Sequence, residues 1–353
     1  MHRTRTLVAL GAASVIAATA IAPSMASAQS DIDELLTGLN SPKGVALLGR
    51  DVVVGQGAFG PPDPALLYIT SGRDRGATIP VSDPSTLVDV AISPVDGTGW
   101  GIVGDEDGGF LVVHQLGDGS VVDVLNTREY QPTDPDPVDQ EGNPTESNAY
   151  GLTIAPNGDA LVADAAGNDI IRVTPDGDAW TVARFDVEAT PTDHVGDPTL
   201  PPMIDAEAVP TTVTFGPDGD IYVGQLKGFP FLPGTSNVWR IDADAAGGWC
   251  SVNTPFSECG VYAGGLTAIQ DIAFNTGGSR LYVLELAEGG VLEFEAGFGT
   301  GEFPDAVLLE LRGSRTRELA AGQLSEPGGI AVHSTGNIYV TDGVFTGGRL
   351  VRI

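Results

Sequence analysis

A short pattern of strand, tight turn and strand recurs along the chain and constrains its fold more than any other feature. Its clearest copy, residues 148–185, predicts four strands at Tyr150–Ala155, Ala160–Asp164, Ile170–Thr174 and Trp180–Phe185. Pro-Asn-Gly-Asp and Pro-Asp-Gly-Asp separate the outer pairs, and these residues make tight reversals because proline presets φ and glycine tolerates positive φ. Four strands joined in this way form a small antiparallel sheet that cannot stand alone, so further copies are expected.

Six copies can be aligned on their first strands: Pro42–Ala46, Leu87–Ala91, Ala149–Thr153, Pro210–Thr214, Ile269–Ala273 and Pro327–Ala331. A turn and a second strand follow each: Asp51–Gly55, Gly99–Gly104, Ala160–Asp164, Ile221–Gln225, Leu281–Glu285 and Ile338–Asp342. The period of 45 to 62 residues is typical of propeller blades that carry loop insertions. The sequence therefore predicts an all-β fold, a six-bladed β-propeller with four antiparallel strands in each blade.

A single domain over residues 29–353 accommodates these blades. The last repeat ends at its third strand, and the segment Glu34–Gly38 resembles Glu318–Gly322 in its sequence and in the Ser that follows. We therefore expect residues 31–40 to complete the sixth blade and pair the two chain ends, which removes exposed strand edges. The blades are expected near 41–82, 87–125, 148–185, 210–263, 268–321, and 325–353 with 31–40.

Residues 1–28 read as a secretory signal: basic residues, an apolar stretch, then Ala26-Ser27-Ala28 as a cleavage site. Cleavage after Ala28 predicts a secreted or extracytoplasmic protein, with no transmembrane segment in the mature chain. It removes two arginines and no acid, so the formal charge falls from −30 to −32. Nucleic acids and anionic membranes bind through cationic patches, so this charge argues against them as partners. We expect a monomer.

Cys250 and Cys259 are the only cysteines, and they lie close together in the sequence of an exported chain. A disulfide is therefore predicted, which would close the long turn between the third and fourth strands of the fourth blade. A redox or metal pair is the alternative, but there is no CxxC pattern and no third soft ligand nearby.

Loop insertions are expected on one face of the disc. The connections between second and third strands and between blades share that face, and they contain the long segments 56–64, 126–147, 186–209, 226–236, 287–304 and 343–347. Within 287–304, the stretch Val291–Glu295 is assigned to an insertion, with Val307–Leu311 and Thr316–Ala320 as the last two strands of the fifth blade. Insertions confined to one face usually mark the binding face, although Pro-rich acidic loops also tolerate sequence drift.

Polar residues at the ends of second strands are candidates for the mouth of the central channel on this loop-rich face: Asp164, Gln225, Glu285 and Asp342. Asp164 with Glu146 and Asn148 could form an oxygen cage for calcium, which prefers carboxylate and amide oxygens. The alternative is that Asp164, Asn168 and Asp169 cap their own strand connection through hydrogen bonds to the backbone.

Lys227, one of two lysines in the chain, precedes Phe229-Pro230-Phe231. A cation beside rigid aromatic rings could hold an aromatic or anionic ligand. Alternatively, Phe229 and Phe231 fold inward and pack the core of their own loop.

Several of these segments resemble a known family. Glu146–Gly151, which contains Tyr150, together with Ala163–Asp169, Val209–Thr211 and Gly228–Phe231, is similar to signatures of the ScyD/ScyE family. The resemblance covers essentially the whole mature chain, with Ala149 in place of a proline and Gln225 in place of a glutamate. It implies an exported, NHL-like six-bladed propeller, and the family has no established reaction. Fold alone does not supply a function.

Two functions remain in view. No GxSxG, HExxH or zinc-ligand spacing occurs, which favours a non-catalytic module that binds a small molecule, glycan or protein at the loop-rich face and channel mouth. The alternative is a calcium-assisted hydrolase or lyase of the lactonase-like propeller type, in which a metal ion polarises a carbonyl or activates water. The ligand-binding candidates are Glu146, Asn148, Tyr150, Asp164, Gln225, Lys227, Phe229, Phe231, Glu285 and Asp342.

Overall fold

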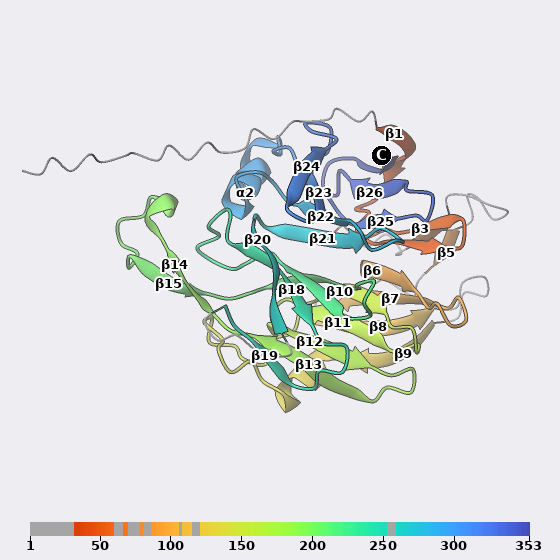
Figure 1. Ribbon diagram of the computed structural model, residues 1–353, viewed down its shortest axis with the longest axis horizontal. Coiled ribbons are helices and arrows are strands. Elements are labelled where there is room, and N and C mark those ends of the chain that lie inside the picture. Colours follow the sequence, from red (N-terminus) through yellow and green to blue (C-terminus); the bar gives the residue numbers. More distant parts are fainter. Residues whose placement is uncertain are drawn as a thin grey trace, which may run out of the picture.

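The computed structural model describes residues 32–59, 66–69, 78–80, 86–105, 108–114, 121–252 and 259–353. These residues form an all-β architecture of six sheets and a separate two-stranded hairpin (Figure 1). The expected all-β class is thus confirmed. The predicted signal segment lies outside the described residues.

Each of the first five sheets contains an antiparallel meander of four strands that pair in chain order. The first sheet contains β2 (Val45–Leu48), β3 (Asp51–Gly55), β4 (Leu66–Ile69) and β5 (Thr78–Pro80), and the second contains β6 (Thr86–Ile92), β7 (Gly99–Asp105), β8 (Gly108–His114) and β9 (Val121–Asn126). The third contains β10 (Ala149–Ile154), β11 (Ala160–Asp164), β12 (Asp169–Val173) and β13 (Ala179–Phe185), and the fourth contains β16 (Pro210–Phe215), β17 (Ile221–Gln225), β18 (Ser236–Ile241) and β20 (Cys259–Leu266). The fifth contains β21 (Ile269–Phe274), β22 (Leu281–Glu285), β23 (Val307–Arg312) and β24 (Arg315–Leu319).

The sixth sheet joins the two ends of the described chain. It contains β25 (Ile330–Val332), β26 (Ile338–Asp342), β27 (Gly348–Arg352) and, beside β27, the N-terminal strand β1 (Asp33–Leu39). The β1–β27 pairing is antiparallel and runs from Asp33 opposite Arg352 to Leu39 opposite Gly348. The expected pairing of the chain ends is therefore present.

Tight turns at the predicted positions connect first and second strands. In the third sheet, Ala155 N–H donates to the Asp159 carbonyl at 2.7 Å, and Gly158 has a φ of +97°. Gly177 has a φ of +92° in the turn between the third and fourth strands of the same sheet. Only glycine adopts such values without strain, so these residues fix where each strand reverses.

The hydrophobic core lies between neighbouring sheets. Between the third and fourth sheets, Ile170, Phe185 and Trp239 are almost fully buried, with the Phe185 and Trp239 ring centroids 5.7 Å apart. Comparable clusters join the second to the third, the fourth to the fifth, the fifth to the sixth, and the sixth to the first sheet. Burial of a large apolar side chain contributes roughly 1.5–3 kcal/mol, so each sheet is stabilised mainly by its neighbours.

The disulfide links two of these sheets. Cys250 ends a short strand, β19 (Gly248–Cys250), that adds to the third sheet parallel to β13, whereas Cys259 begins β20 of the fourth sheet. The S–S bond between them is 1.97 Å long. The predicted disulfide is therefore present in the expected connection. The exchange of β19 to the neighbouring sheet was not predicted.

The long insertions form local structure of their own. They contain α1 (Thr127–Tyr130) with η1 (Gln131–Thr133), the hairpin of β14 (Glu188–Pro191) and β15 (Met203–Ala206) with η2 (Asp193–Val195), and α2 (Val291–Thr300). In Figure 1 the β14–β15 hairpin projects from the sheets at the left. None of the described helices is long and apolar enough to cross a membrane.

Residues 291–300 form a helix, α2, where the sequence predicted only an insertion. Glu293 in its first turn accepts a hydrogen bond from Gly289 N–H at 2.8 Å, and Gly301 ends the helix in the left-handed conformation. A first-turn carboxylate and a terminal glycine are common helix signals. The predicted last strands of this repeat, Val307–Leu311 and Thr316–Ala320, correspond to β23 and β24.

Candidate binding site in the central cavity

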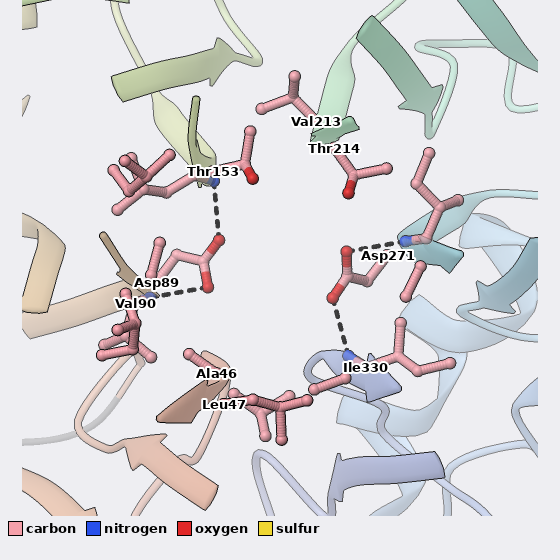
Figure 2. Close-up of a pocket in the computed structure, with 17 residues that line it drawn as sticks. Ala46, Leu47, Asp89, Val90, Thr153, Val213, Thr214, Asp271 and Ile330 are labelled. Carbon is pink, nitrogen blue, oxygen red and sulfur yellow. Dashed lines mark hydrogen bonds between the residues drawn. The ribbon is translucent and has the colours of Figure 1, made fainter. Parts of the chain in front are cut away.

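The first strands of all six sheets surround one cavity of about 320 Å³ (Figure 2). Two layers of small or aliphatic residues, at equivalent positions of the repeats, form most of its wall. The first layer is Val45, Val90, Leu152, Val213, Ile272 and Ile330, and the second is Ala46, Ala91, Thr153, Thr214, Ala273 and Ala331. Side chains on the inner face of a first strand therefore define this site.

Two carboxyl groups, Asp89 on β6 and Asp271 on β21, project into the cavity from opposite sides (Figure 2). Asp89 accepts hydrogen bonds from its own neighbour Val90 N–H and from Leu152 N–H of the next sheet, both at 2.9 Å. Asp271 accepts from Ile272 N–H and from Ile330 N–H of the next sheet, both at 2.8 Å. We call Asp89 and Asp271 the cavity carboxyls.

A third donor distinguishes Asp271 from Asp89. The Thr212 hydroxyl donates to Asp271 Oδ1 at 2.5 Å. Each cavity carboxyl thus ties its own sheet to the following one, and Asp271 also holds the preceding sheet. Asp271 Oδ1 therefore accepts two hydrogen bonds, whereas Asp271 Oδ2 and both Asp89 oxygens accept one each and have a further lone pair for a ligand.

Glycines beside the cavity carboxyls let the first strands approach closely. The equivalent positions of the six repeats are Gly44, Asp89, Gly151, Thr212, Asp271 and Gly329. A Cβ atom at Gly329 would lie 2.7 Å from the Lys43 carbonyl oxygen, and one at Gly44 would lie 2.6 Å from Val90 N. The two aspartates are three repeats apart in this series of six, which accounts for their opposite placement.

Burial changes the acidity of both cavity carboxyls. Burial, assisted by the charge of Asp89, raises the pKa of Asp271 from 3.8 to about 6. Burial also raises the pKa of Asp89, an effect that Lys43 opposes. Both side chains nevertheless keep partial accessibility, because the cavity reaches them. A ligand can therefore contact two carboxyls whose protonation differs from that of surface aspartates.

Lys43, Tyr150 and Gln270 form a polar layer one residue before the cavity carboxyls along the first strands. Lys43 is 3% exposed, donates to the Tyr150 carbonyl at 2.8 Å, and lies 4.0 Å from the centroid of the Tyr150 ring. Tyr150 Oη accepts from Gln270 Nε2 at 2.7 Å. Of the ten predicted ligand residues, Tyr150 is the one that belongs to this polar layer, through its contacts with Lys43 and Gln270.

The carboxyls at the ends of second strands, Asp164, Glu285 and Asp342, hold the backbone instead. We call them the strand-end carboxyls. Each accepts the N–H of a residue that leads into the first strand of its own sheet: Asn148 at 2.7 Å, Thr267 at 2.8 Å and Ser325 at 2.8 Å, respectively. None of the three lines the cavity. Gln225, at the equivalent place, accepts from Trp239 Nε1 at 2.5 Å.

The three residues predicted as a calcium cage do not converge. Asp164 is fully buried and accepts from Ser147 Oγ and Gly167 N–H in addition to Asn148 N–H. Glu146 is exposed and accepts from Asn143 Nδ2 at 2.8 Å. Over the described ranges, no three His, Cys, Asp or Glu side chains are grouped so that they could hold a metal ion.

Lys227 is engaged within its own region. It is 3% exposed and forms an ion pair with Glu188 of β14. Phe229 is 39% exposed and meets the half-buried Phe231 edge to face, with centroids 5.8 Å apart. The Lys227 ammonium group therefore binds the β14–β15 hairpin through Glu188.

An aromatic surface that the sequence analysis missed joins three insertions. It consists of Phe59, Phe298 and Phe345, which are 44%, 57% and 41% exposed. Phe345 lies 5.4 Å from Phe59 and 5.1 Å from Phe298 between ring centroids, and Phe59 lies 6.4 Å from Tyr150. Residues 56–59 of the first insertion thus meet the insertions 287–304 and 343–347 near Tyr150.

Comparison with solved structures identifies similar folds. A glucose dehydrogenase aligns with a TM-score of 0.59 and 13% identity over 92% of this chain and 99% of its own. The soluble aldose sugar dehydrogenase from Escherichia coli aligns with a TM-score of 0.55 and 12% identity over 91% and 98%. Virginiamycin B lyase from Staphylococcus aureus aligns with a TM-score of 0.50 and 16% identity over 88% and 82%.

These likenesses support a β-propeller fold, and at such identities they show the fold alone. No family model matches the chain, and no curated protein matches it.

Proposed function

We propose that the six sheets are the blades of a six-bladed propeller and that the protein is a binding module that takes a small molecule into its central cavity. The observation that carries this proposal is the placement of Asp89 and Asp271 on opposite sides of a cavity of about 320 Å³. Small-molecule sites are typically concave and mostly apolar, with a few convergent polar groups. The cavity shares the concave shape and the convergent polar groups of such sites, although polar atoms make up most of its accessible lining.

The ligand is a small ammonium ion with a short alkyl body. A cationic nitrogen between the cavity carboxyls donates to both of them, and charge-assisted hydrogen bonds are about twice as strong as neutral ones. The alkyl body lies against the aliphatic layers above the carboxyls. Among the described residues, Lys43 is the positive group that acts on the two carboxyls, so one added monocation balances them when both are ionised.

The location and the family resemblance belong to the same proposal. An extracytoplasmic protein is supported by the signal-like segment 1–28 and by the Cys250–Cys259 disulfide, which forms in oxidising compartments. The resemblance to the ScyD/ScyE family remains part of the proposal and is compatible with the β-propeller likenesses.

Calorimetric titration with n-butylammonium, 1-butanol and butyrate tests the proposal, since these probes share an alkyl chain and differ in charge. We expect n-butylammonium to bind with one-to-one stoichiometry, 1-butanol to bind at least about tenfold more weakly, and butyrate not to bind. Asp89→Asn and Asp271→Asn should each weaken binding of n-butylammonium by about tenfold or more.

Asp218→Asn is the matched control. Asp218 accepts from Tyr222 Oη and Arg240 Nε and lies outside the cavity lining. Its substitution should leave the titration unchanged. Equal affinities for the three probes, or no binding of n-butylammonium to a folded protein, would refute the proposal.

Acid–base catalysis in the same cavity is the second candidate. The raised pKa of Asp271, about 6, favours it, because two facing carboxyls of unequal protonation can serve as acid and base. A lyase is among the proteins of similar fold. The test is turnover of a panel of p-nitrophenyl esters and glycosides, with a pH–rate profile that loses a limb near pH 6 in Asp271→Asn.

A further inference from the structure

Two buried acceptor atoms between the 126–147 insertion and the third sheet lack a hydrogen-bond partner: Gln131 Oε1 and Asp169 Oδ1. Gln131 belongs to η1 and is 0% exposed, and Asp169 begins β12 and is 1% exposed. Burying a polar atom without a partner is costly, so each such atom in a folded protein requires an explanation.

The side chains that carry these two atoms already face one another. Gln131 Nε2 donates to Asp169 Oδ2 over 3.4 Å. The unpaired atoms are therefore the two that a carboxylic acid and a primary amide join in a second hydrogen bond, from the acid O–H to the amide oxygen. One proton on Asp169 Oδ1 would satisfy both atoms.

Tight packing holds the Gln131 amide in this place. A Cβ atom at Gly167 would lie 1.9 Å from Gln131 Nε2 and 3.3 Å from the Asp164 carboxyl carbon. Glycine at 167 therefore leaves the space that the amide occupies, and the amide cannot be displaced toward the β11–β12 connection without a clash.

The surrounding charges disfavour an ionised Asp169. Asp164 on β11 lies directly opposite it in the strand register, and Asp134, after η1, adds a second negative charge. The cation in reach is Arg184 on β13, which is paired with Asp134. Tyr130 on α1 also senses Asp169 and is neutral at ordinary pH.

Asp164 and Asp169 differ in the number of hydrogen bonds that they accept. Asp164 accepts from Ser147, Asn148 and Gly167, whereas Asp169 accepts from Gln131 alone. Burial and the charge of Asp164 raise the pKa of Asp169 well above its usual range. If only one of the pair carries a proton, it is Asp169.

We propose that Asp169 is a neutral carboxylic acid in the folded protein and that its O–H donates to Gln131 Oε1, which fastens the 126–147 insertion to the third sheet. The insertion lies on the expected loop-rich face, where it also contacts the next insertion through the Gln140 N–H to Glu207 hydrogen bond at 2.6 Å. The bond is thus a pH-sensitive attachment of a surface segment, and it is independent of ligand binding in the cavity.

The sign of the pH effect follows from proton linkage. The folded state retains a proton that the unfolded chain releases near the ordinary aspartate pKa of 3.8. The folded state is therefore disfavoured progressively as pH rises above that value, until the folded carboxyl itself ionises. Asp169→Asn removes this dependence, because an amide at 169 donates to Gln131 Oε1 at every pH.

Urea unfolding of the full chain from about pH 4 to pH 9 compares the wild type with Asp169→Asn. We expect the unfolding equilibrium constant of the wild type to rise relative to the variant, by up to about tenfold per pH unit. Asp176→Asn, an exposed turn residue, is the control and should follow the wild type. At neutral pH, the infrared difference spectrum between the wild type and Asp169→Asn should contain one carbonyl band of a protonated carboxylic acid that the variant lacks, beyond any band from Glu285, which is common to both proteins.

Parallel pH curves for the wild type and Asp169→Asn, or an ionised Asp169 in the infrared spectrum, would overturn the proposal. So would stabilisation of the wild type by added calcium or sodium that Asp169→Asn abolishes, since a bound cation would then replace the proton.

Discussion

The cavity carboxyls lie in the middle of the first strands of two sheets, whereas the strand-end carboxyls lie at the ends of the second strands of three sheets. Both sets are buried acids that accept backbone N–H groups. The cavity carboxyls accept donors from the next sheet and retain accessible surface, but the strand-end carboxyls accept donors from their own sheet and are nearly inaccessible.

The difference shows how a recurring acid can serve either structure or recognition. An acid at the end of a second strand lies beside the segment that enters the first strand of the same sheet, and its oxygens accept the N–H groups of that segment. An acid on the inner face of a first strand meets the cavity as well. The predictions below test this division.

The strand-end position should carry the largest stability effect. Asp164→Ala leaves the Asn148 and Gly167 N–H groups without their acceptor and opens a cavity in a buried site, so the free energy of unfolding should fall by about 4 kcal/mol. Urea denaturation measures it, and Asp176→Ala at an exposed turn should change stability by less than about 0.5 kcal/mol. A small effect of Asp164→Ala would remove the structural role assigned to the strand-end carboxyls.

The two sets should differ in their pH windows. Asp271 has a folded pKa of about 6, and Glu285 has one of about 7, both raised by burial. The folded state binds these protons more tightly, so stability falls as pH rises from near 4 and levels off at each folded pKa. For Asp271 the loss is about 3 kcal/mol at most. In Asp271→Asn, the loss of stability that levels off near pH 6 should disappear, and in Glu285→Gln the loss that continues to about pH 7 should disappear. Denaturation curves that do not change in these variants would contradict the pKa shifts.

The glycine beside a cavity carboxyl should resist enlargement. Gly329→Ala places a Cβ 2.7 Å from the Lys43 carbonyl and 3.2 Å from Asp271 Oδ2, and should cost about 2 kcal/mol of stability. Gly260→Ala on β20 is the control, since no atom of the described residues, apart from its own chain neighbours, lies within 4 Å of its added Cβ. Thermal melting compares the two, and equal melting temperatures would show that close approach of the first strands is unimportant.

The stability gained on ligand binding should depend on the cavity carboxyls and not on the strand-end carboxyls. With n-butylammonium at ten times its dissociation constant, the folded state should gain about 1.4 kcal/mol. The bound cation favours ionised Asp271, so this gain should be larger above pH 6 than below it. Glu285→Gln should keep the full gain and Asp271→Asn should lose most of it. The reverse pattern would assign the ligand to the strand-end region.

The fold could be predicted from sequence to a large extent, because tight turns and apolar runs are local signals. Five of the six predicted second strands match the observed ones at both ends, and β7 is one residue longer. Both cysteines pair as expected. The transfer of β19 to the third sheet could not be predicted, since it depends on a parallel contact with β13, more than sixty residues earlier.

The site was predicted less well. Tyr150 was identified, but Asp89 and Asp271 were not, although the aligned repeats place an aspartate at the same position of the second and fifth copies. Lys227 was predicted to bind a ligand but is paired with Glu188, whereas Lys43, which was not predicted, lies near the cavity beside Tyr150. An aspartate at one inward position of an otherwise apolar first strand is the sequence pattern that could have identified Asp89 and Asp271. Polar residues at strand ends are poor indicators of a binding site, because they often form hydrogen bonds to the nearby backbone.

The pairing of β1 with β27 has a consequence for synthesis. Strand β1 has no partner until β27 has been synthesised, so a nascent or truncated chain that stops before β27 carries β1 as an unpaired strand. Completion of the sixth sheet therefore requires that synthesis has proceeded past Arg352.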